Sequence, residues 1–312
     1  MMRNHIQVFS HRSNNHKEGL MKIYTTNPTR FSGRCARFLG AMLMTASMVA
    51  PAAIAAGPAA VNLGTAANFA ILAYNGISDT PTSIITGNIG VSSAGGGASI
   101  GVTCPEVTGT IYSPDAAGPP CKVTDATLLG IAMGDITAAY GDALSRATDF
   151  LNTGNGAGEI GGQTLAPGVY TFTGASNNVL ISTALTLNGN SNDVWIFQIP
   201  GTFNVHANVI LGGSAQAKNI FWAVAGATTI FPGFTVNGNI LDHTSIAMQS
   251  LATLNGRALS ETASVTLIAN TVTKPVVAGV IPTFTEWGLI LFALLIAAFA
   301  IWRIRSRRFR VA

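Results

Sequence analysis

The chain has 312 residues, of which 48% are hydrophobic and 10% are charged, and its sequence pI is about 9.1. The basic residues are concentrated at the two ends, since seven Lys and Arg precede residue 57 and five follow residue 288. The body, residues 57–275, has five Lys and Arg against eleven Asp and Glu, a net charge of −6. This mildly acidic body lacks the basic surface that nucleic-acid binding requires, so no nucleic acid partner is expected.

Residues 1–56 are predicted to be a signal peptide region. An apolar stretch, residues 38–54, follows three arginines and precedes small residues, which is the pattern of an export signal: Arg30, Arg34, Arg37, then Ala55 and Ala56. We expect cleavage near Ala55 or Ala56. Because the polar part before Arg30 is long for a signal peptide, Met21 is an alternative first residue to Met1.

Two of the three cysteines lie in the body of the chain. Cys35 belongs to the signal peptide region, whereas Cys104 and Cys121 lie in a Gly/Pro-rich segment. A cysteine pair in an exported protein is most simply a disulfide, and closing so short a loop stabilises the fold by about 3 kcal/mol in the chain-entropy model. Without a neighbouring histidine the pair is a poor zinc site, so no metal is predicted.

One long amphipathic helix is predicted over residues 124–150. Its apolar stripe comprises Leu128, Ile131 or Ala132, Ile136, Tyr140, Leu144 and Ala147, and Thr124 is the expected N-cap. Such a stripe must be buried. We expect it to pack on a sheet face that carries Trp195, Phe197, Phe221 and Trp222.

Most of the remaining body reads as short strands separated by Gly, Asn and Pro turns. The predicted strands are 169–173, 179–181, 185–187, 194–197, 203–205, 209–211, 220–224, 228–230 and 265–267. Three turns repeat a Thr-x-Asn-Gly pattern, Thr186–Gly189, Thr235–Gly238 and Thr253–Gly256, with residues 210–213 as a degenerate copy. Repeats of about 20 residues indicate a mainly β fold, a triangular β-solenoid in which each repeat is one coil.

Alternation along these strands predicts which residues fill the core and which form outward rows. The expected core residues are Leu185, Leu187, Phe203, Val205, Ile230, Val265 and Leu267. The expected first row is Leu180, Asn204, Thr229, Ala247 and Thr266; the second is Ser182, His206, Phe231, Gln249 and Ile268; the third is Thr186, Ile210, Thr235 and Thr253. Leu180, His206, Phe231 and Ile268 interrupt what would otherwise be regular polar rows.

An enzyme is not predicted, because the acid chemistry of solenoid glycosidases requires carboxylates that converge in a groove. The candidates are Asp193, which precedes a strand and reads as a turn cap, and the pair Asp242 and His243, for which the sequence indicates no partner. His206 reads as an isolated surface residue. No nucleophile elbow, metal-binding histidine cluster or phosphate loop occurs, so no cofactor is expected.

The C-terminal end has three parts: a linker and polar motif at 276–287, an uncharged apolar segment at 288–302 and a basic tail at 303–312. The apolar segment would span only about 22 Å as a helix, which makes it a marginal transmembrane segment. Trp287 and Trp302 bracket it, and the arginines beyond it would stay in the cytoplasm. A plain tail anchor is one interpretation.

The tail resembles the IPTL-type C-terminal sorting signals of Gram-negative bacteria. The resemblance rests on Ile281, Pro282, Thr283, Glu286, Trp287 and Gly288, although Phe284 stands where Leu is usual and Thr285 where Ser is common. It implies recognition and cleavage by a membrane transpeptidase, and hence delivery to the cell envelope or outer surface, with or without later release.

Several ordered motifs of the body resemble the ice-binding-like (DUF3494) proteins: 61–72, 85–92, 160–170, 193–198, 217–222 and 254–259. The resemblance covers residues 61 to 275, within a domain expected at 57–275. It implies a discontinuous right-handed β-solenoid with the long helix alongside, a capping insertion before that helix, and binding to an ice crystal surface through one flat face. The protein is expected to be a monomer.

The expected ice-binding residues are Thr186, Asn204, Thr229, Thr235, Thr253 and Thr266. A flat array of short polar side chains with few charges suits this function, because ordering it costs little entropy. The competing interpretation is an envelope adhesin or structural protein that binds glycan or another surface. Exposed aromatic residues would favour that role, and Phe231 and Phe234 near Pro232 are the candidates.

Overall fold

The computed structural model describes residues 57–93, 99–276, 288 and 290–299. The predicted signal peptide region, the sorting residues 281–287 and the basic tail lie outside the described residues. The division into domains made from the sequence therefore stays a prediction at both ends.

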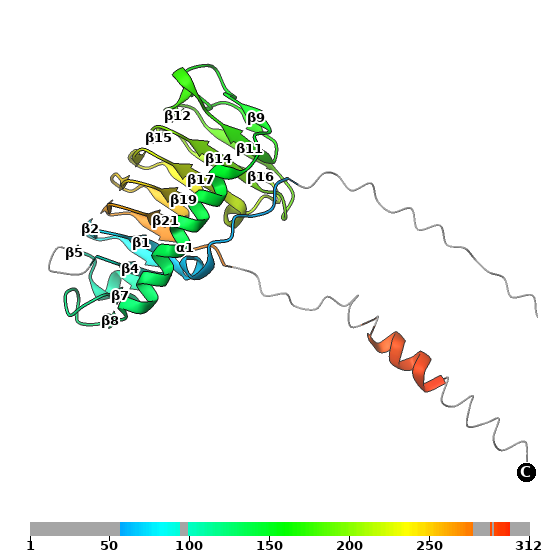
Figure 1. Ribbon diagram of the computed structural model, residues 1–312, viewed down its shortest axis with the longest axis horizontal. Helices are drawn as coiled ribbons and strands as arrows, with labels where there is room; N and C mark the ends of the chain where they lie inside the picture. The colour runs from blue at the N-terminus through cyan, green and yellow to red at the C-terminus, as the bar shows by residue number, and fades with distance from the viewer. Residues whose placement is uncertain (1–56, 94–98, 277–287, 289, 300–312) are drawn as a thin grey trace, which may run out of the picture. The chain divides into compact units, whose positions relative to one another are not determined.

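The described body is mainly β, and its strands form three parallel sheets of 13, seven and three strands (Figure 1). The seven-stranded sheet contains, in spatial order, β12 (Val179–Ile181), β15 (Phe203–Val205), β18 (Thr228–Ile230), β20 (Ile246–Met248), β22 (Ser264–Ile268), β2 (Gly76–Thr80) and β5 (Ser99–Ile100). The three-stranded sheet contains β10 (Thr164–Leu165), β13 (Leu185–Gly189) and β16 (Val209–Gly213).

The 13-stranded sheet, called the long sheet below, has a main path and a branch. The main path is β8 (Val123–Thr124), β7 (Ile111–Ser113), β4 (Asn88–Val91), β1 (Phe69–Ala73), β21 (Thr253–Ser260), β19 (Thr235–Asp242), β17 (Ile220–Val224), β14 (Trp195–Ile199), β11 (Gly168–Thr171) and β9 (Phe150–Leu151). The branch leaves β21 and contains β23 (Thr271–Thr273), β3 (Ile84–Thr86) and β6 (Val107–Thr108).

The chain contributes strands to the different sheets in turn, and one such round of strands is called a circuit. Chain order is interrupted at one point, because β1 pairs in parallel with β21, with Ile71 opposite Ala258. The strands of residues 69–91 therefore stack beyond the last strands of the body. The described residues also contain four short 3-10 helices, of which the first precedes β1 and the others connect strands: η1 (Gly64–Asn68), η2 (Cys104–Glu106), η3 (Gly174–Ser176) and η4 (Ala217–Asn219).

The interior between the sheets is apolar, and every core residue expected from the strand pattern is fully buried: Leu185, Leu187, Phe203, Val205, Ile230, Val265 and Leu267. Two of the Thr-x-Asn-Gly repeats stack in register, with Thr235 opposite Thr253 and Gly238 opposite Gly256. Glycine is required at Gly256, since a Cβ there would lie 1.7 Å from the carbonyl oxygen of Gly238. The repeats thus mark a place where adjacent circuits approach closely.

The helix α1 (Ala126–Ser145) is shorter than predicted, and its buried stripe matches the prediction in part, since Ala132 and Ile136 are buried as expected. Its N-cap is Asp125, whose Oδ1 accepts from the Leu128 amide at 2.9 Å, so the expected Thr124 cap is wrong. The buried stripe comprises Leu129, Ala132, Ile136, Ala139 and Ala143, whereas Ile131 and Leu144 are 55% and 42% exposed and Ala147 is exposed. Small alanines face the sheet because they allow the helix to approach it closely.

The helix covers the long sheet, as expected, but only one of the four aromatic residues predicted beneath it faces it (Figure 1). Phe221 packs against α1 together with Ile196, Leu241 and Leu259. Trp195, Phe197 and Trp222 point into the interior instead. Successive side chains on a strand alternate between the two faces of a sheet, so neighbours in sequence cannot all contact the helix.

Cys104 and Cys121 form a disulfide, which confirms the predicted pairing. Near the C-terminus, Gly288 and residues 290–299 are helical. Among the residues that the structure describes, no helix combines the length and hydrophobicity needed to cross a bilayer. The predicted membrane segment at 288–302 therefore stays a prediction.

Candidate binding face

The outer surface of the seven-stranded sheet carries the predicted first row as a continuous stack. Parallel pairing places Leu180, Asn204, Thr229, Ala247 and Thr266 opposite one another in that order. The stack continues to Ser78 on β2, which pairs with Thr266. Sequence reasoning missed Ser78, because its strand lies near the start of the body and belongs to no repeated motif. We call these six residues the binding face.

The side chains of the binding face are short, uncharged and partly fixed by hydrogen bonds. Asn204 Nδ2 donates to Thr202 Oγ1 at 3.0 Å, and Ser78 Oγ donates to Thr266 Oγ1 at 3.3 Å. Strands of one sheet lie about 4.7–4.9 Å apart, so the row repeats at this interval. A rigid row of this kind can order water without attracting ions.

The predicted second row lies at the corner that follows these strands. Three of its backbone amides donate to carbonyl groups of the preceding circuit: His206 N to Ile181 O at 2.8 Å, Phe231 N to Val205 O at 2.9 Å and Gln249 N to Ile230 O at 2.9 Å. The amides of Ser182 and Ile268 donate to side chains instead. The His206 ring stacks on Phe231 with centroids 3.5 Å apart, so His206 is not isolated. Phe234 packs against the core. Both aromatic residues considered for glycan binding are therefore engaged within the protein.

The predicted third row is divided into two shorter rows. Thr186 pairs with Ile210 in the three-stranded sheet, whereas Thr235 pairs with Thr253 in the long sheet. No strand pairing joins Ile210 to Thr235. Side-chain amides occupy this junction instead: Thr235 N donates to Asn208 Oδ1 at 2.9 Å, and Asn237 Nδ2 donates to Val209 O at 2.7 Å. The second part continues to Thr271 on β23, which sequence reasoning also missed.

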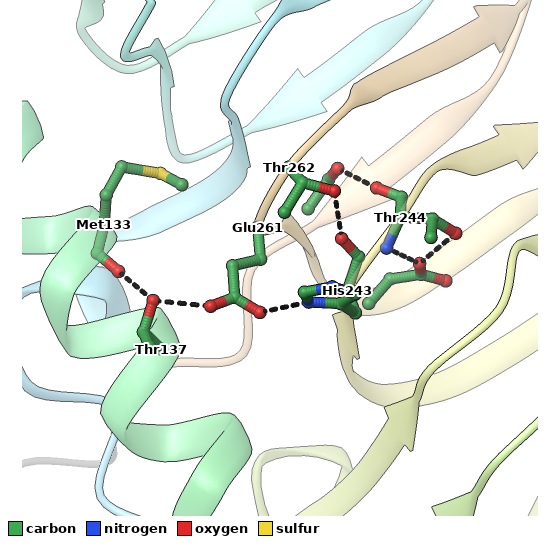
Figure 2. Close-up of polar contacts among 8 residues, drawn as sticks. Met133, Thr137, His243, Thr244, Glu261 and Thr262 are labelled. Carbon is green, nitrogen blue, oxygen red and sulfur yellow. Dashed lines mark hydrogen bonds and ion pairs between the residues drawn. The ribbon is translucent and has the colours of Figure 1, made fainter.

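The polar residues considered for catalysis have structural partners. Asp193 Oδ2 accepts from the Asn190 amide at 2.7 Å, which agrees with a turn cap. His243, for which no partner was expected, lies 2.7 Å from Glu261, and Glu261 also accepts from Thr137 of α1 at 2.6 Å (Figure 2). This cluster links the helix to a corner of the sheets.

Asp242 also has partners that the sequence did not indicate. Its carboxylate accepts from Thr228 Oγ1 at 2.5 Å and from the Thr244 amide at 2.8 Å. The carboxyl group is only 1% exposed, and this burial raises its pKa to about 7 despite those hydrogen bonds. A group so enclosed cannot reach a substrate.

The described residues contain no cluster of three His, Cys, Asp or Glu that could hold a metal ion. A cleft of about 550 Å³ lies near the end of α1, lined by Gly57, Pro58, Arg146, Ala147, Asp149, Phe150, Pro167 and Val169. None of the candidate ice-binding or catalytic residues lines this cleft.

Comparison with known proteins identifies the body of the chain. A family model described as Ice-binding-like matches residues 71–273, and a second model, the IPTL-CTERM motif, matches residues 281–308. The chain belongs to the ice-binding-like family. Both resemblances seen in the sequence are thereby confirmed, and the C-terminal motif indicates export and cell-surface sorting.

Relatives of this ice-binding-like chain occur in bacteria. An ice-binding protein of Flavobacterium frigoris (strain PS1) is 52% identical over 218 residues, which cover 69% of this chain and 76% of the relative. An ice-binding protein of a Colwellia species is 46% identical over 237 residues, which cover 75% of this chain and 91% of the relative.

Solved structures agree with the fold of this family member. An antifreeze ice-binding protein from an Arctic yeast aligns with a TM-score of 0.63 and 37% identity, over 70% of this chain and 96% of the yeast chain. The ice-binding domain of a Shewanella frigidimarina protein aligns with a TM-score of 0.61 and 28% identity, over 71% of this chain and all of that domain. The parallel-sheet architecture is thus shared.

Proposed function

We propose that this protein binds ice and that it adsorbs through the binding face of the seven-stranded sheet. The observation that carries this proposal is the stack Leu180, Asn204, Thr229, Ala247, Thr266 and Ser78, which is in register through six strands without a charged residue. Family membership supports ice as the ligand. We also propose that the fold is a discontinuous, right-handed triangular β-solenoid.

The chemistry of the row suits an ice surface better than a soluble ligand. A threonine offers a methyl group that excludes water and a hydroxyl that can join a water lattice, and both are held rigidly on a β-sheet. Short side chains lose little conformational entropy on adsorption. Binding of this kind blocks crystal growth by adsorption and needs neither catalysis nor a cofactor.

The row is irregular, and this limits the activity that we expect. Leu180 and Ala247 offer no hydrogen-bonding group, and only Thr229 and Thr266 are threonines within the stack. We therefore expect measurable ice shaping with moderate thermal hysteresis.

The other predicted contacts, Thr186, Thr235 and Thr253, form a second candidate face. They are less favoured because their row is divided between two sheets at Ile210 and Thr235. A flat crystal plane requires an uninterrupted array. This face therefore serves as the natural comparison in a test.

The test measures thermal hysteresis and ice-crystal faceting of the purified exported protein and of two double variants. Thr229→Tyr with Thr266→Tyr should abolish faceting, because two bulky rings would project from the binding face. Thr235→Tyr with Thr253→Tyr, the matched control, should leave faceting intact. Circular dichroism must show that each variant is folded. The reverse pattern would move the site to the second face, and no faceting by folded wild type would refute ice binding.

We propose further that the protein is exported as a monomer and that a membrane transpeptidase recognises its C-terminal motif. The specific observation is the IPTL-CTERM match at residues 281–308. An envelope adhesin that binds glycan or another surface is the second candidate, favoured by this sorting motif. Binding of the exported protein to glycan arrays, in the absence of ice activity, would support the adhesin instead.

A further inference from the structure

A buried carboxyl group at the end of β19 in the long sheet, that of Asp242, is hydrogen-bonded to residues next to the binding face. Parallel pairing places Asp242 in an inward column with Ile199 and Val224 of the two preceding circuits, and with Ser260 and Ala73 of the two that follow. An aliphatic or small residue fills this position in each neighbouring circuit. The fold alone therefore does not require a carboxylate there, and a buried charge is costly unless it serves a purpose.

The hydrogen bonds of Asp242 connect two strands of the face. Oδ2 accepts from Thr228 Oγ1 at 2.5 Å, and Thr228 is the residue before Thr229. Oδ1 accepts from the amide of Thr244 at 2.8 Å and from its hydroxyl at 3.2 Å, and Thr244 leads into β20, which carries Ala247. Ser260 Oγ in turn donates to the Thr244 carbonyl. One carboxylate thus ties the starts of β18 and β20.

We propose that Asp242 is a positioning residue for ice binding: by holding Thr228 and Thr244 it sets the relative placement of Thr229 and Ala247 on the binding face. The inference rests on the proposed function. Asp242 itself never contacts ice, since it lies inside the fold. Its effect on ice is transmitted through the two strands.

Protonation provides a way to separate positioning from stability. Three donors converge on Asp242, an arrangement that suits the ionised carboxylate, so the placement of the strands is best defined above pH 7. The contribution of Asp242 to the free energy of unfolding depends on pH in the opposite way, since it is larger at low pH. The folded pKa is about 7 against an ordinary 3.8, so the folded protein binds more protons and stability falls as pH rises between these values.

The ionisable groups at this corner are His243, Glu261 and Tyr140, which lie on its outer side toward α1. His243 pairs with Glu261 and stacks on Tyr140, with ring centroids 5.9 Å apart. Negative charge on Glu261 and Asp242 adds to burial in raising the pKa of Tyr140. A His243→Gln variant leaves Asp242 and its hydrogen bonds in place and therefore serves as the control for changes in this outer cluster.

The experiment measures thermal hysteresis and melting temperature from pH 5.5 to 8.5 for wild type, Asp242→Asn, Asp242→Val and His243→Gln. Asp242→Val copies Val224 of the preceding circuit, so it should fold, with a lower melting temperature because Thr228 and Thr244 lose their acceptor, and it should lose roughly half or more of the hysteresis while still folded near 0 °C. Wild type and His243→Gln should lose hysteresis as pH falls through about 7 while the stability contributed by Asp242 increases. Asp242→Asn should show no such titration.

A spectroscopic measurement keeps this inference separable from the proposed function. The methyl resonances of Thr229 and Ala247 should titrate with a midpoint near the Asp242 pKa of about 7 in wild type and not in Asp242→Asn. Titrating methyls in a protein without hysteresis would refute ice binding and retain the positioning role. Full hysteresis in Asp242→Val, or activity that follows stability with pH, would overturn the positioning role.

Discussion

Leu251 combines two features that are unfavourable for a leucine. Its φ is 61°, and 69% of its surface is exposed. The same corner position is occupied by Gly233 in the preceding circuit and Ala269 in the next, at φ values of 75° and 50°. The corner therefore requires a left-handed backbone in successive circuits, and glycine satisfies this at no steric cost.

We expect Leu251→Gly to stabilise the protein by about 0.5–1 kcal/mol, because relief of the left-handed backbone exceeds the extra entropy of glycine in the unfolded chain. Chemical denaturation measures the change. Leu251→Ala is the control, since it retains the Cβ and should change stability little. A destabilised glycine variant would show that the leucine side chain packs against a neighbour.

At the level of single residues, some positions could be predicted from the sequence and others could not. The stack from Leu180 to Thr266 could be predicted because alternation within short strands fixes which residue faces outward. The corner of Asp242 could not, since Thr228 and Thr244 reach its carboxylate only after the circuits are stacked.

At the scale of the elements, the carbonyl groups at the C-terminal end of α1 obtain a hydrogen-bond donor from the long sheet. Gln198 of β14 donates from Nε2 to the carbonyl oxygens of Ala143 at 2.9 Å and Arg146 at 2.9 Å, at the C-terminal end of the helix. Gln198 is only 6% exposed, and its Oε1 accepts from Thr171. Carbonyl groups at a helix end otherwise lack partners.

Gln198→Leu should destabilise the protein by about 1–3 kcal/mol, because buried carbonyl groups would lose their donor. Urea denaturation would measure this loss, and hydrogen exchange should increase first in the last turn of α1. Gln216→Leu, at an exposed position, should have little effect. Equal stability of the two variants would contradict the capping role.

The outer face of α1 carries three glycines at positions where a side chain could be accommodated. A Cβ at Gly130, Gly134 or Gly141 would meet nothing within 4 Å. Gly134→Ala should therefore stabilise the protein by about 0.5–1 kcal/mol, since alanine favours a helix interior. Calorimetry would measure the gain. Gly90→Ala should have the opposite effect, because its Cβ would lie 2.6 Å from a Leu129 methyl group.

The helix also shows why its orientation was harder to predict than its existence. Apolar residues occur all around α1, and the predicted stripe left only the choice between Ile131 and Ala132 open. The structure buries the stripe of alanines and leaves Ile131 and Leu144 outside. Close approach of a helix to a flat sheet favours small residues, a tertiary effect that periodicity alone does not contain.

At the scale of the whole molecule, the segment that carries the disulfide packs where the order of the strands in the chain is interrupted. Cys104 begins η2, and Glu106 in the same turn accepts from Thr103 N at 2.6 Å and Ser83 N at 3.0 Å. The disulfide and the hydrogen bonds of the buried Glu106 carboxylate therefore fix this segment through residues outside the strands that carry Thr229 and Thr266.

Replacing both cysteines by serine should therefore reduce stability without removing ice activity. A separation of 17 residues corresponds to a loss of about 3 kcal/mol in the chain-entropy model, or roughly 6–12 °C in melting temperature for a domain of this size. Thr229 and Thr266 lie in circuits that do not contain the loop, so hysteresis near 0 °C should persist. Loss of hysteresis in a folded variant would show that the disulfide segment contributes to the surface that contacts ice.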